Sequence, residues 1–103
     1  MKLKEGVDPT GIQPELLLAI MAAKEAYRDY GYDLVITSLT DGKHSRTSLH
    51  YSGCAVDLRT RHMDTEEDKA EIATLIKDSL GLDYDVILES THIHIEWQPK
   101  RRD

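Results

Sequence analysis

The sequence predicts an α+β fold in which two helices pack on a small, largely antiparallel sheet. Two segments repeat apolar residues with a helical period, and segments with strand-like patterns lie between and after them. The last two strand-like segments are separated by only two residues, which indicates a hairpin. A chain of 103 residues is long enough for one domain and too short for two, so we expect a single domain over residues 1–103.

The first helix is predicted to begin at Pro14 and to end before Gly31. Proline suits the first position of a helix, and glycine suits the position just after its end. Between them, apolar residues recur at helical spacing, at Leu16, Ile20, Ala23, Tyr27 and Tyr30. Residues 33–38 follow, and their β-branched centre is typical of a buried strand.

Residues 39–53 show no periodicity and are rich in glycine and serine, so we expect a long loop there. Compact domains seldom contain a long loop without a functional reason. Residues 55–59 return to an alternating pattern, which predicts a strand that places Ala55, Asp57 and Arg59 on one face.

The second helix is predicted to begin after Thr65, a residue suited to capping a helix N-terminus. Asp68 occupies the capping-box position, and Gly81 provides the stop signal. Residues 84–89 and 92–97 then form the expected hairpin.

Composition and charge exclude several classes of function. The formal net charge of -6 argues against nucleic-acid binding, which requires a basic face. The basic residues 100–102 are interpreted as a solubilising tail, and Cys54, the only cysteine, permits no intramolecular disulfide. The longest apolar stretch, residues 16–23, is too short to span a bilayer, so we expect no membrane insertion. No signal peptide is evident, and we therefore expect cytoplasmic synthesis.

The five histidines are unevenly distributed. His44 and His50 lie in the loop before Asp57, and His92 and His94 lie in the last predicted strand. Because side chains alternate along a strand, His92, His94 and Glu96 share one face. Ile93, Ile95 and Trp97 take the other, core-facing side. A solvated outer face would also explain this pattern, and for Glu96 we expect a supporting or solvated role.

A metal site is the other explanation for these histidines. Two histidines and one aspartate, with a fourth position left open, are typical of catalytic zinc sites. His50, Asp57 and His94 fit that donor set if the fold brings them together.

Residues 48–57, Ser-Leu-His-Tyr-Ser-Gly-Cys-Ala-Val-Asp, match the Ser-x-His-x-x-Gly-x-Ala-x-Asp signature of the zinc D-Ala-D-Ala carboxypeptidase family. That family includes bacterial carboxypeptidases, dipeptidases and phage L-alanyl-D-glutamate endolysins. The chain more closely resembles the amino-terminal signalling domain of hedgehog proteins, which shares their fold. This likeness covers residues 41–45, the signature, Glu89-Ser90 and residues 92–94. It implies a bacterial or phage member with a hedgehog/DD-peptidase-like fold.

The resemblance implies a role for each matching residue. His50, Asp57 and His94 match the three zinc ligands, so we expect one Zn²⁺ per chain. Glu89 matches the acid beside the water that attacks the substrate, and His92 matches a histidine of the zinc pocket. His44 matches another histidine lining that pocket.

Two other loop residues are assigned more loosely. Arg46 is a candidate partner for a substrate carboxylate, with a surface role as the alternative. Ser48 is a turn-stabilising hydroxyl that we group with the candidate substrate-binding residues.

The predicted function is therefore that of a zinc metallopeptidase, either a carboxypeptidase or an L-Ala-D-Glu endopeptidase. Its substrate would be a peptidoglycan stem peptide containing D-amino acids. We expect a monomer acting as a phage or prophage lysis enzyme, or as a cytoplasmic dipeptide-processing enzyme. The alternatives are a non-catalytic, zinc-stabilised, hedgehog-like binding module and an interaction domain without a metal. Calcium is not expected, because Asp41 is the only acid near the zinc loop and Leu39 stands where hedgehog proteins carry another.

Overall fold

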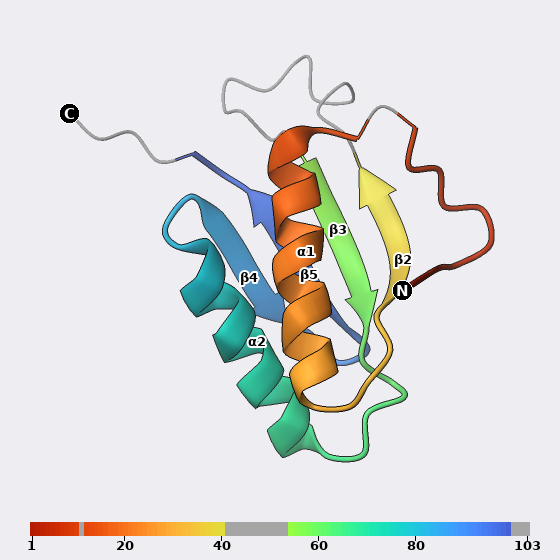
Figure 1. Ribbon diagram of the computed structural model, residues 1–103, viewed down its shortest axis with the longest axis vertical. Helices are drawn as coiled ribbons and strands as arrows, with labels where there is room; N and C mark the ends of the chain where they lie inside the picture. The colour runs from red at the N-terminus through yellow and green to blue at the C-terminus, as the bar shows by residue number, and fades with distance from the viewer. Residues whose placement is uncertain (11, 41–53, 100–103) are drawn as a thin grey trace.

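The computed structural model describes residues 1–10, 12–40 and 54–99. It contains two helices on one face of a five-stranded mixed sheet with the strand order β1-β2-β3-β5-β4 (Figure 1). The helices are α1 (Pro14–Asp29) and α2 (Glu66–Leu80). The strands are β1 (Lys2–Leu3), β2 (Val35–Thr40), β3 (Cys54–Arg59), β4 (Tyr84–Leu88) and β5 (His92–Trp97). This arrangement confirms the predicted α+β class.

The sheet is antiparallel except at one edge, where the two-residue strand β1 pairs in parallel with β2. β1 was not predicted from the sequence, because two residues are too few to show an alternating pattern. β2 also differs from its prediction: it extends to Thr40, into the segment expected to be loop. Among the described residues, no helix is both long and apolar enough to cross a membrane.

The ends of the helices follow the predicted signals. Gly31 has a φ of 80°, and its N–H bonds to the Arg28 carbonyl, while the Tyr32 N–H reaches the Tyr27 carbonyl. These two bonds form a Schellman motif, for which glycine is the best-suited residue. At the start of α2, the Thr65 hydroxyl accepts a hydrogen bond from the Asp68 N–H at 3.0 Å, as the capping signal predicted.

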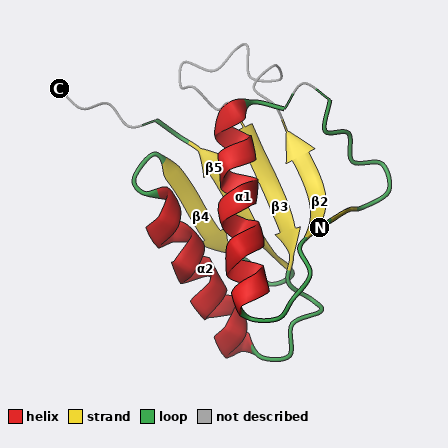
Figure 2. Ribbon diagram, viewed as in Figure 1, coloured by secondary structure: helices red, strands yellow, loops and turns green. Residues whose placement is uncertain are grey.

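Both helices cover the same face of the sheet, as Figure 2 shows. The strand side chains on that face are fully or almost fully buried: Ile36, Val56, Leu58, Ile93 and Ile95. They pack against buried residues of α1 and α2 in one hydrophobic core. In β5 half-buried and buried residues alternate from His92 to Glu96, so the predicted assignment of its two faces is correct for Ile93 and Ile95. Trp97 is half-buried and packs against the core. The polar residues of β5 therefore lie on the other face, which neither helix of the described residues covers; we call it the helix-free face.

Candidate metal centre

The site residues of β3 and β5 face each other across two neighbouring strands. The antiparallel register places Asp57 directly opposite His94, and Arg59 opposite His92. Directly opposed residues on one face of a sheet have their Cβ atoms about 5 Å apart, so their side chains meet. His94 Nδ1 lies 2.7 Å from Asp57 Oδ1. Two of the three predicted zinc ligands are thus in contact.

A β-bulge in β2 lies beside Asp57. The register of the β2–β3 pair shifts between Ile36 and Ser38, and Ser38 stands opposite Asp57. The hydroxyl of Thr37, within the bulge, donates a hydrogen bond to the Asp57 carbonyl at 3.3 Å. Bulges are frequent next to functional sites, because they redirect a side chain or end a pairing. This contribution of Thr37 was not predicted, since nothing in the residue pattern marks a bulge.

The β4–β5 hairpin brings Glu89 to the same face. Its N–H bonds to the His92 carbonyl at 2.8 Å, which closes the expected two-residue turn. The Glu89 carboxylate lies 2.6 Å from His92 Nε2, across the turn of the hairpin. His92 Nε2 is in turn 3.7 Å from Asp57 Oδ1, so His92 stands between the two acids. The other ring nitrogen, Nδ1, is 3.1 Å from the Thr91 hydroxyl.

A third carboxylate completes this row of side chains. Glu96 Oε1 lies 3.1 Å from His94 Nε2, and the Gln98 side-chain amide donates to Glu96 Oε2. The sequence placed Glu96 on the same face as His94 but did not predict this bond. The signal was present, because residues two apart in a strand share a face and lie within reach of a long side chain.

Electrostatics favour a cation at this place. Three carboxylates, those of Asp57, Glu89 and Glu96, lie among two imidazoles on a partly exposed surface. Burial lowers the pKa of His94, but its hydrogen bonds to Asp57 and Glu96 outweigh that effect and raise the pKa above its ordinary value. In the metal-free protein, the two carboxylates that flank the ring therefore favour the protonated, cationic form of His94.

The remaining predicted site residues fall outside the described part of the chain. They are His44, Arg46, Ser48 and His50, all in the segment between β2 and β3. Within the described residues, no three His, Cys, Asp or Glu side chains are grouped so as to hold a metal ion. The third ligand of the predicted set, His50, lies outside the described residues.

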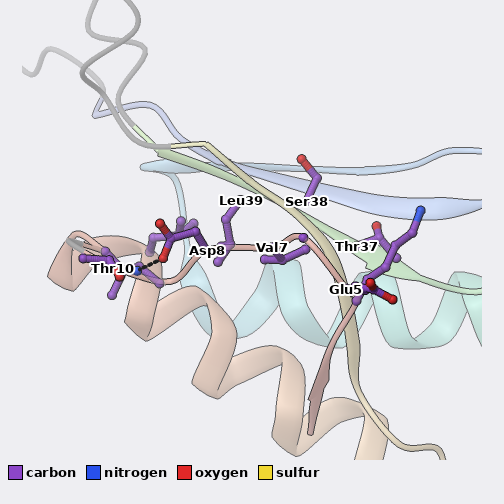
Figure 3. A pocket seen from close by; sticks show the side chains of 11 residues that line it. Glu5, Val7, Asp8, Thr10, Thr37, Ser38 and Leu39 are labelled. Atoms are coloured by element: carbon purple, nitrogen blue, oxygen red, sulfur yellow. Dashed lines mark hydrogen bonds between the residues drawn. The ribbon is translucent and has the colours of Figure 1, made fainter.

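Another pocket, of about 430 Å³, lies between β2 and the N-terminal segment, toward the β1 edge of the sheet (Figure 3). Residues 4–8 line one side of it, and Thr37, Ser38 and Leu39 line the other. Its described lining contains none of the predicted metal ligands or catalytic residues. The candidate site is instead an open patch on the helix-free face.

A family comparison decides the wider assignment. The family model of the hedgehog amino-terminal signalling domain matches residues 17–96, which is more than half of the chain. The chain belongs to the hedgehog signalling-domain family. The match to this hedgehog-like domain begins in α1 and runs through both β3 and β5, so it spans the strands that carry Asp57 and His94. No curated protein and no solved structure matches the chain significantly.

Proposed function

We propose that this hedgehog-like domain binds one zinc ion through His50, Asp57 and His94 and hydrolyses peptide bonds in peptidoglycan stem peptides that contain D-amino acids. The observation that carries the proposal is the contact between Asp57 and His94, with the Glu89–His92 pair beside it. In the proposed function these contacts would pair two metal ligands next to a base, on a sheet face that no helix of the described residues covers.

The donor atoms suit zinc. Zinc binds imidazole nitrogen at 2.0–2.1 Å and carboxylate oxygen at a similar distance, so two donors of one tetrahedral ion lie about 3.3 Å apart. His94 Nδ1 and Asp57 Oδ1 are 2.7 Å apart, and a small rotation of either side chain would admit the ion. The His94 and Asp57 side chains are only 27% and 28% exposed, so both are partly withdrawn from water. A cation between them would also reduce the repulsion among the neighbouring carboxylates.

The chain's own residues would supply the proton transfers. When bound, zinc provides a Lewis acid that polarises the scissile carbonyl and lowers the pKa of a water molecule. Glu89 takes the proton of the attacking water and passes it to the leaving amine. His92, whose Nε2 lies between Glu89 and Asp57, donates a hydrogen bond to the developing oxyanion. His44, Arg46 and Ser48 remain our candidates for contacts with the substrate.

The alternative is a zinc-stabilised binding module without catalysis, and one observation favours it: the matching family is a signalling domain. The contact of Glu89 with His92 favours the enzyme, since a module that only binds has no need of a base beside its metal. As an enzyme, the protein would take a peptidoglycan-derived peptide as its substrate and act as a monomer, for example in phage or prophage lysis.

The variant Glu89→Gln separates the two functions. It should retain zinc and the melting temperature of the wild type, while its rate of releasing new termini from purified peptidoglycan falls about 100-fold or more, as expected for the loss of a general base. Glu67→Gln, which changes an exposed glutamate in the first turn of α2, is the matched control and should keep full activity. A wild-type protein that binds zinc but releases no termini would support the binding module instead.

A further inference from the structure

Glu96 occupies a position that neither the metal site nor the proposed catalytic steps account for. It lies two residues after His94 on β5, and its Oε1 atom is 3.1 Å from His94 Nε2. The opposite ring nitrogen of His94, Nδ1, faces Asp57 at 2.7 Å. The imidazole is therefore held at both ends, by Asp57 on β3 and by Glu96 on its own strand.

Glu96 is itself fixed in place. Its second carboxylate oxygen, Oε2, accepts a hydrogen bond from the Gln98 side-chain amide. The backbone N–H of Gln98 bonds to the Asp83 carbonyl at 2.7 Å, which ties this end of β5 to the residue before β4. The Glu96 side chain is 28% exposed, so it is not a freely rotating surface group. Each of its two oxygens thus has a separate partner, and together these bonds set the plane of the carboxylate.

We propose that Glu96 is a positioning residue that selects the tautomer and orientation of His94 for metal binding. In the metal-free protein both ring nitrogens face a carboxylate, and a bound metal would replace the proton on the nitrogen that it binds. Because a carboxylate accepts but does not donate, Glu96 would hold the remaining ring proton on Nε2 and leave the Nδ1 lone pair for the metal. Nδ1 is the atom that faces Asp57, so the lone pair points to the place where both ligands would share the ion. Histidines that bind metals commonly donate their other N–H to a carboxylate in this way.

This inference rests on the metal-binding half of the proposed function and is independent of catalysis. It specifies the supporting role that the sequence allows for Glu96, and it differs from the solvated alternative. A solvated carboxylate would contribute only its charge to the site. A positioning carboxylate also determines which nitrogen of His94 binds the metal, and a neutral acceptor such as the glutamine carbonyl can partly replace it.

The test compares E96A, E96Q and the control E67A by competing each protein against a zinc chelator at constant pH. E96A should bind zinc about 10- to 100-fold more weakly than the wild type, the usual effect of removing the partner of a metal-bound histidine. E96Q should lose less, because its carbonyl still accepts the Nε2 proton, and E67A should match the wild type. Melting curves of the metal-free variants separate this effect from a loss of folding.

Nitrogen NMR of the zinc-loaded protein reads the tautomer directly. We expect metal on Nδ1 and a proton on Nε2 of His94 in the wild type and in E96Q, with that proton exchanging faster in E96A. The inference is overturned if E96A binds zinc within about threefold of the wild type, or if zinc is found on Nε2 of the wild type. Zinc binding that is insensitive to His94→Ala would overturn the proposed ligand set together with this inference. Zinc binding without peptidase activity would overturn only catalysis, with the role of Glu96 supported by the same shifts.

Discussion

Alanine substitutions of two isoleucines beside His94 test whether the candidate site lies on the helix-free face of the sheet. Ile95 follows His94 on β5 and is fully buried. Ile87 is the cross-strand neighbour of His94 on β4 and is 49% exposed. Truncating a buried isoleucine to alanine costs about 2–5 kcal/mol, because a cavity remains in addition to the lost transfer free energy. We therefore expect Ile95→Ala to lower the free energy of unfolding by about 3 kcal/mol. Ile87→Ala should cost less than about 1 kcal/mol, since it leaves no cavity and removes a half-exposed side chain.

The assays are urea denaturation and thermal melting of both variants. Both are run in the presence of a chelator, so that metal binding does not contribute to stability. A domain of this size changes its melting temperature by roughly 4–8 °C per kcal/mol, so Ile95→Ala should melt more than about 10 °C below the wild type. Both variants remove the same atoms beside the same histidine, which makes them a matched pair. Equal losses, or a larger loss for Ile87→Ala, would show that the faces of β5 are reversed and that His94 does not lie on the open face.

Two further predictions concern cations and protons. Millimolar calcium at constant ionic strength should leave the melting temperature unchanged. Zinc added to the metal-free protein should raise the melting temperature by mass action. A calcium-dependent rise in melting temperature would contradict the expected absence of a calcium site. The metal-free protein should also lose stability as the pH rises. The pKa of His94 is raised from 6.5 in the folded state, so its contribution is complete below pH 6.5 and is lost as the pH passes through the folded-state pKa. Denaturation midpoints across this range should change less in His94→Ala, and an equal change in both proteins would refute the assignment.

The sequence predicted the fold well where local patterns decide the structure. Both helices begin and end at their predicted signals, because proline, threonine and glycine act within a few residues of their own position. The alternation in β5 predicted its buried face for the same reason. The edge strand β1 could not be predicted, because its two residues form a strand only through pairing with β2, more than thirty positions away.

In the candidate site, too, local patterns could be predicted and long-range contacts could not. Alternation along β5 predicts that His92, His94 and Glu96 share a face, but the sequence does not state which residue of β3 stands opposite them. That depends on the register, which pairs Asp57 with His94 and is accompanied by the bulge around Thr37 in β2. The bond between Glu96 and His94 depends on rotamers as well as on the strand pattern. Long-range register and side-chain orientation were therefore beyond what the residue pattern alone determines.

The zinc content of ligand variants tests the central claim most directly. Elemental analysis of protein purified without added metal should find close to one zinc per chain in the wild type, as expected for a single site with two histidines and one aspartate. His94→Ala should lose most of that zinc, because it removes a ligand. His92→Ala should retain it, because His92 contacts Glu89 and lies farther from Asp57 than His94 does. Full zinc in His94→Ala together with its loss in His92→Ala would contradict the assignment of the metal centre.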